Sequence, residues 1–152
     1  MISQHNKNIG ALTHLSALSK FIIPLGNFIL PIVLWTLHKD KSEFIDQNGK
    51  QIINFQISIL IYSVIIGAIT IPLFAFGILE HIELLDIING MHHNINLDIN
   101  DEASFQLIAL VIVIIIIAIL ISVFEIILII LATTRASNGD IYKYPLTINF
   151  LK

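Results

Sequence analysis

The 152-residue sequence contains no cysteine and has few charged residues. Without cysteine, the chain can form no disulfide, thiolate nucleophile or cysteine metal site. Charged residues make up 12% of the chain, against about 25% in ordinary soluble domains. The net charge is only -3, and no basic stripe interleaved with aromatic residues is present. We therefore expect no nucleic-acid partner.

The usual motifs of catalysis are missing as well. The sequence has no recognisable Ser-His-Asp set, no glycine-rich phosphate loop and no paired carboxylates within its apolar runs. It therefore predicts neither an enzyme nor a cofactor. One stretch combines histidines with acids, but their spacing fits no standard ligand set and we expect no metal there: His81, His92, His93, Asp98, Asp101 and Glu102.

Apolar residues make up 56% of the chain and gather in long runs. Leu107 to Phe124 has Ser122 as its only polar side chain, and Ile57 to Leu79 is uncharged. About 20 apolar residues are enough for a helix to cross a bilayer, and an unbroken apolar run can satisfy its backbone in lipid only as a helix. The sequence predicts two transmembrane helices, at 51–79 and 104–136, in a lipid bilayer.

The first apolar region, 9–37, is less regular. Pro24, Gly26, Asn27 and Pro31 interrupt it, which predicts two short helices broken around Pro24 to Asn27. The predicted fold class is an all-α integral membrane protein with an interrupted N-terminal helical hairpin and two long transmembrane helices. The whole chain, 1–152, is expected to form a single membrane domain.

The basic residues predict the orientation. Lys39, Lys41 and Lys50 place the loop at 38–50 in the cytoplasm, and the loop at 80–103, which has no Lys or Arg, outside. The tail at 137–152 then returns to the cytoplasm. Lys7 favours a cytoplasmic start, with a first region that enters the membrane and returns. Lys20, near the deep end of such a hairpin, leaves open a single crossing with an external N-terminus.

Two short motifs carry a family resemblance. The chain resembles the bacterial family called domain of unknown function 4870 in its Asn54-Phe55-Gln56 turn and its Tyr144-Pro145-Leu146-Thr147 tail. Asn48 and Gln51 depart from that family's usual histidine and glutamate. The resemblance implies a bacterial inner-membrane protein of unassigned activity, remotely similar to a component of the chloroplast Tic protein-import translocon.

A single acid, Glu125, lies inside an apolar run. It precedes Arg135 by ten residues, or about 15 Å along a helix, which places it near the middle of the membrane. A charge there costs at least about 2.5 kcal/mol, so the carboxyl must be protonated, paired or open to water. It either accepts a hydrogen bond from Ser63, Tyr62 or Thr70, or lines an ion path together with Asn27.

The remaining candidate residues favour packing roles. We expect Asn54, Phe55 and Gln56 to pack helices together and His14 to lie at the interface. Residues 144–147 are expected to lie over the cytoplasmic loop, or to dock a partner by strand addition. The leading hypothesis is a non-enzymatic interaction or translocation-associated subunit that binds itself or another membrane protein. The alternative is a small ion or solute conductor that uses Glu125.

Overall fold

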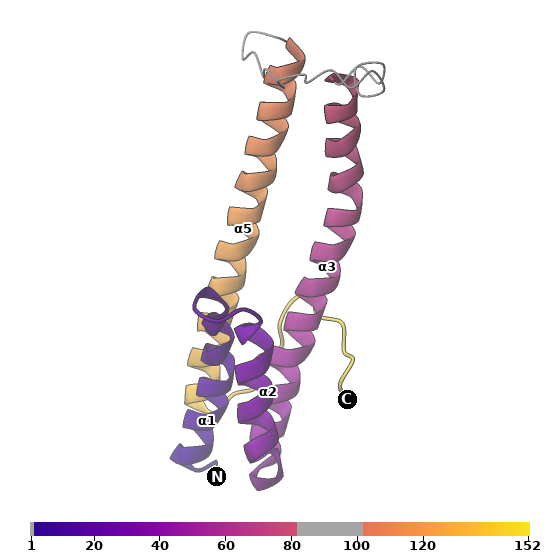
Figure 1. Cartoon of the computed structure of the whole chain (residues 1–152). Helices are drawn as coiled ribbons and strands as arrows, with labels where there is room; N and C mark the ends of the chain where they lie inside the picture. The colour runs from indigo at the N-terminus through magenta and orange to yellow at the C-terminus, as the bar shows by residue number, and fades with distance from the viewer. Residues whose placement is uncertain (1, 82–101) are drawn as a thin grey trace. The chain divides into compact units, whose positions relative to one another are not determined.

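The computed structural model describes residues 2–81 and 102–152, and every regular element within those ranges is helical. The predicted all-helical class is therefore confirmed. Most of the expected loop at 80–103 lies outside the described residues. The elements follow one another along the chain (Figure 1) as α1 (Gln4–Leu15), η1 (Ser16–Phe21), α2 (Gly26–His38), η2 (Lys39–Lys41), α3 (Glu43–His81) and α5 (Glu102–Asn138).

Two of these helices are long and apolar enough to cross a membrane. The segments Glu43–Leu73 of α3 and Ile108–Asn138 of α5 each contain 31 residues, which extend over about 46 Å as a helix. The hydrocarbon core of a bilayer is about 30 Å thick. Large side chains along them, such as Leu60 and Ile130, are half exposed. Such a surface suits lipid better than water.

The described chain forms two compact units. One contains Met1–Tyr62 and Ser122–Lys152, and the other contains Ser63–Ile121. The second unit consists of the later part of α3 and the earlier part of α5, where large apolar side chains such as Val64 and Leu120 are exposed. The first unit contains the N-terminal hairpin, the rest of α3 and α5, and every candidate site residue.

The N-terminal hairpin begins at a capped helix and turns back on itself. The Ser3 side chain accepts a hydrogen bond from the Asn6 amide and so caps α1. After η1 the chain turns through residues 22–25, and Leu25 adopts a left-handed conformation with φ 60°. The 13 residues of α2 extend over about 20 Å, which is shorter than the hydrocarbon core.

The open end of this hairpin is tied to the ends of both long helices. Lys7 of α1 donates a hydrogen bond to the Asn138 carbonyl at the end of α5, with an N to O distance of 3.1 Å. The Trp35 indole of α2 donates to Asp46 near the start of α3 at 2.9 Å. The start of α1, the end of α2, the start of α3 and the end of α5 thus share one end of the unit (Figure 1).

The core of the first unit lies between α3 and α5 and is rich in small and β-branched residues. Its fully buried alanines let the helices approach closely, as in other membrane helix pairs. The larger cluster comprises Ala17, Ile52, Ile53, Phe55, Leu128, Ile129, Ala132 and Tyr144, and a smaller one comprises Ala11, Phe44, Ile45 and Ala136.

The closest approach within the hairpin is at Gly26, and it yields a first prediction. A Cβ at this position would lie 2.8 Å from the backbone carbonyl of Ser19, which cannot move without distorting η1. We expect Gly26→Ala to lower the free energy of unfolding by about 1–3 kcal/mol, measured by circular dichroism during SDS titration of the protein in mixed micelles.

Gly67→Ala is the matched control. A Cβ there would meet only the tip of Ile71, 4.0 Å away, and alanine is the better helix former. This variant should lose no stability. Equal stability of the two alanine variants would contradict the close packing at Gly26.

Candidate functional site

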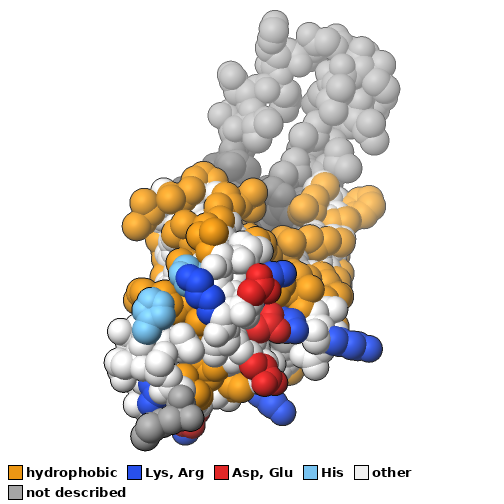
Figure 2. Space-filling model, turned by 90° about the horizontal axis from the view of Figure 1, so that it is seen from below, with side chains coloured by type: hydrophobic (Ala, Val, Ile, Leu, Met, Phe, Trp, Pro, Cys, Tyr) orange, Lys and Arg blue, Asp and Glu red, His pale blue; other side chains and the backbone are white. Residues whose placement is uncertain are grey.

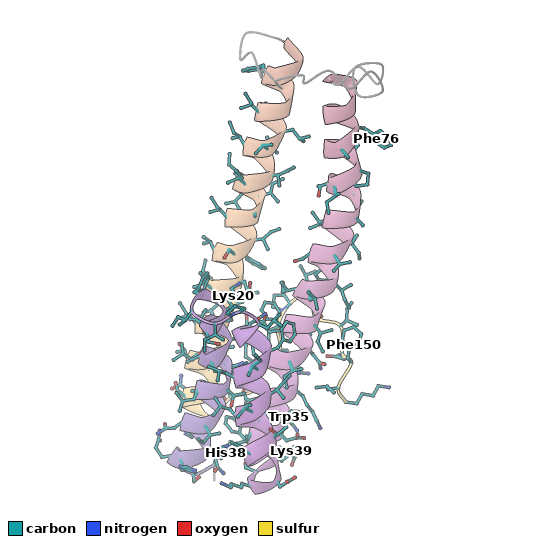
Figure 3. All side chains as sticks on the ribbon, viewed as in Figure 1. Lys20, Trp35, His38, Lys39, Phe76 and Phe150 are labelled. Carbon is teal, nitrogen blue, oxygen red and sulfur yellow. The ribbon has the colours of Figure 1, made fainter. Side chains whose placement is uncertain are left out.

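Four polar side chains from four different elements meet in the first unit. Lys20 of η1 forms an ion pair with one carboxylate oxygen of Glu125 in α5. The Gln56 amide of α3 donates to the other oxygen at 3.1 Å. Asn27 at the start of α2 donates to the Gln56 carbonyl oxygen at 2.7 Å. We call these four residues the Glu125 cluster. Lys20 lies near the turn of the hairpin, at the opposite end of it from Trp35 and Lys39 (Figure 3).

The side chains of the Glu125 cluster bind one another's polar groups. Both oxygens of Glu125 are occupied, and its side chain is only 4% exposed, against 22% for Lys20. Gln56 uses its nitrogen as donor and its oxygen as acceptor, which fixes the orientation of its amide. A carboxylate in apolar surroundings is stabilised when it is both paired and hydrogen-bonded. The cluster meets both conditions.

The partners of Glu125 differ from those expected from the sequence. Tyr62 donates to the Leu146 carbonyl and Thr70 to the Ile66 carbonyl, so neither hydroxyl donates a hydrogen bond to Glu125. Lys20, which the sequence did not connect with Glu125, pairs with the acid.

A second buried network centres on His14. The Tyr144 hydroxyl donates to His14 Nδ1 at 2.9 Å, and His14 Nε2 bonds the Asn48 side-chain oxygen at 2.8 Å. The Asn48 amide nitrogen is already used, because it donates to the Phe44 carbonyl at 2.8 Å. Asn48 therefore accepts from His14, and the proton of the neutral imidazole lies on Nε2.

The surroundings of His14 correct the expectation that it lies at the interface. The side chain is fully buried, and this burial lowers its pKa to about 4, although the Asn48 hydrogen bond acts in the opposite direction. Burial also raises the pKa of Tyr144 well above its ordinary value, and the nearby Tyr142 and Glu125 act in the same direction. Both groups are therefore neutral at neutral pH.

The segment after α5, which we call the strap (residues 139–152), is held by side chains of α3. Asn54 accepts from the amides of Leu151 at 2.8 Å and Phe150 at 3.2 Å, and its own amide donates to the Leu151 carbonyl. Ser58, one turn further along, accepts from the Ile148 amide at 2.9 Å. The strap lies along α3, and the position of residues 144–147 over the cytoplasmic loop stays a prediction.

The three residues of the Asn54-Phe55-Gln56 motif therefore contact three different partners. Asn54 binds the strap, and Gln56 belongs to the Glu125 cluster. Phe55 is buried and stacks on the Tyr144 ring, with centroids 4.2 Å apart and an interplanar angle of 12°. The motif thus contacts Tyr144 of the second motif, which sequence reasoning did not predict because the two lie about ninety residues apart.

A polar cleft of about 560 Å³ lies between the start of α3 and the strap. Its acids and bases include Asp46, which Lys50 pairs at 2.6 Å, and the more exposed Lys143 and Lys152 of the strap. Within residues 2–81 and 102–152, no group of three or more histidines and acids is placed to hold a metal ion. The histidines and acids at 82–101 lie outside the described residues.

The helices and the satisfied inner polar groups define a small helical membrane protein. The chain belongs to the magnetosome magnetite crystal formation protein family, whose model matches residues 5–151. No curated protein and no solved structure matches it. The resemblance to domain of unknown function 4870 was therefore wrong. The remote likeness to the Tic translocon, which rested on that resemblance, was wrong as well. The two short motifs that suggested the resemblance make internal packing contacts, which do not identify a family.

The Glu125 cluster yields a second prediction. Lys20→Met leaves a buried carboxylate without its cation, and we expect a loss of roughly 3 kcal/mol or more in the free energy of unfolding. Glu125→Gln should cost less, because Lys20 is partly exposed and can turn towards headgroups. The double variant Lys20→Met/Glu125→Gln should regain most of the loss. Additive losses in this double-mutant cycle, measured by SDS titration, would show that the pair is not coupled.

The buried histidine yields a third prediction, on pH. A histidine in the unfolded chain takes up its proton near pH 6.5 and the folded one only near pH 4. The stability contributed by neutral His14 is therefore complete above pH 6.5 and is lost as the pH falls towards 4. We expect about 2 kcal/mol less stability at pH 5 than at pH 8 from this residue. His14→Gln should remove that part of the pH dependence; an unchanged pH profile in the variant would argue against it.

Proposed function

We propose that the chain is a non-enzymatic membrane subunit that takes part in magnetite crystal formation by binding other membrane proteins or further copies of itself. The family description supports a part in magnetite crystal formation. The proposed mode of action rests on one observation about Glu125. Both of its carboxylate oxygens are bound by side chains of the same chain. Glu125 therefore stabilises the fold, and the outer surface is the part of the protein that we propose binds partners.

The same geometry counts against the alternative of an ion or solute conductor. A conducting path needs polar groups that are open to water. Glu125 is 3% exposed, and Asn27 already donates to Gln56. Glu125, on which the conductor hypothesis depends most, is therefore not available to a passing ion.

The proposed location is a bacterial inner membrane, crossed by α3 and α5, with the hairpin entering and leaving from the cytoplasmic side. Several observations support this topology. Lys7 reaches the end of α5, and α2 is too short to cross. Figure 2 shows charged side chains gathered on the end of the molecule, with apolar side chains around them. The lysines of residues 38–50 belong to this end, as the positive-inside rule requires of a cytoplasmic face.

The apolar sides of the long helices are the proposed contact surface. Side chains of α5 such as Phe124, Ile127 and Leu131 are about half exposed in the first unit. In lipid, such faces associate by close packing and not by a hydrophobic driving force. The partners proposed are the lipid bilayer and a second copy or another membrane protein, and no nucleic acid.

The fourth prediction tests this proposal. Extraction in a mild detergent, followed by light-scattering mass measurement, should give a protein mass well above the 17.0 kDa of one chain, or a co-purifying membrane protein. Loss of the protein from a magnetite-forming cell should change crystal number or size in electron micrographs. A strictly monomeric protein that binds nothing, with unchanged crystals, would refute the proposal.

A flux measurement separates the two functions. Liposomes containing wild-type protein and liposomes containing Glu125→Gln should both remain tight to ions. Flux through the wild type that disappears in Glu125→Gln would favour the conductor instead.

A further inference from the structure

The strap forms a loop whose turn points along α3, away from the charged end. It leaves α5 after Asn138, passes Tyr144, turns at Pro145 and Leu146, and returns beside Asn54 (Figure 1). The Leu146 carbonyl accepts from Tyr62 at 2.7 Å. Tyr62 lies eight residues beyond Asn54, so the turn of the strap is about 12 Å further along α3 than its returning arm.

The register on α3 also gives the depth of this turn. Tyr62 is twelve residues past Lys50, or about 18 Å along the helix axis. Half of the hydrocarbon thickness is about 15 Å. A side chain on a helix points back towards the helix N-terminus, so the turn at Leu146, which the Tyr62 hydroxyl binds, lies nearer to the charged end than the Cα of Tyr62. With Lys50 among the headgroups, the turn still reaches the depth of the acyl chains, whereas Lys143 and Lys152 flank the loop near the charged end.

The side chains of the strap are arranged for apolar surroundings. Leu146 is 76% exposed. It lies in a turn with φ 58°, where glycine or asparagine is more usual. Ile148 and Phe150 are also exposed, and Figure 3 shows Phe150 on the outside of the strap. The turn of the N-terminal hairpin has the same character, with exposed Ile22 and left-handed Leu25.

Side chains of α3 bind part of the backbone of the strap. Irregular backbone is tolerated at membrane depth only where protein groups satisfy its polar atoms. Asn54, Ser58 and Tyr62 supply such partners, one per turn of α3. The strap thus directs backbone groups of Leu146, Ile148, Phe150 and Leu151 towards α3, while the side chains of Leu146, Ile148 and Phe150 are exposed.

We propose that the strap is a re-entrant membrane element, in which Leu146, Ile148 and Phe150 contact the acyl chains of the bilayer. Lipid is the occupant favoured by continuity, since Leu60 of α3 is likewise half exposed at the same level. The lysines at both ends of the loop suit headgroup phosphates. The proposal rests on the membrane location in the proposed function, and it replaces a free cytoplasmic tail with an inserted one.

The absence of cysteine allows a direct test. Single cysteines at Leu146, Ile148, Leu60 and Asp140 would each carry a nitroxide label in proteoliposomes. Electron paramagnetic resonance then compares collisions with oxygen, which concentrates in hydrocarbon, and with a water-soluble nickel complex. We expect the oxygen-to-nickel ratio at Leu146 and Ile148 to match that at Leu60, and to exceed that at the exposed Asp140.

The controls distinguish the ways in which this can fail. A ratio at Leu146 and Ile148 equal to that at Asp140, with Leu60 still in lipid, would overturn the inserted strap alone. Water-like ratios at Leu60 as well would overturn the membrane location on which it rests. Spectra at Leu146 that broaden, and then narrow when unlabelled protein is added, would assign the surface to a second copy and also overturn the proposal.

Discussion

The pairing of Lys20 with Glu125 constrains the whole first unit. A carboxylate removed from water is costly unless it is paired and hydrogen-bonded. Here its two partners come from η1 and α3, and Asn27 of α2 binds one of them, Gln56. The hairpin cannot leave the two long helices without stranding a charge on α5. One acid therefore fixes the position of η1, α2 and α3 around α5, more specifically than apolar packing among isoleucines and alanines could do.

The same rule explains the other polar residues of α3. Asn48, Asn54 and Ser58 are all buried, and each binds a group from another segment or from the strap. Such bonds are modest individually in membranes, of order 1 kcal/mol, but each specifies a partner. The polar side chains of α3 thus determine where the hairpin and the strap bind, while the outward-facing side chains of the helix stay apolar.

The sequence predicts the helical class because long apolar runs have only one way to satisfy their backbone in lipid. It does not predict the Glu125 cluster, because Lys20 and Glu125 are 105 residues apart and only the packed hairpin brings them together. His14 was misplaced for the same reason: periodicity places it on a helix face but does not say that Tyr144 covers that face. The short motifs misled about the family because their residues serve contacts that many helical membrane proteins need.

These internal contacts bear on how the protein acts. In the part of the chain that the structure describes, the buried carboxylate and the buried histidine are both bound by neighbouring side chains, and both are closed to solvent. A group in that state can hold the fold in register, but it cannot receive an ion from water. This supports the proposal that residues 2–81 and 102–152 act through their surfaces, which are the apolar sides of the long helices and the charged end of the first unit. The strap lies where these two surfaces meet, since its lysines belong to the charged end and its leucine and isoleucine to the apolar side.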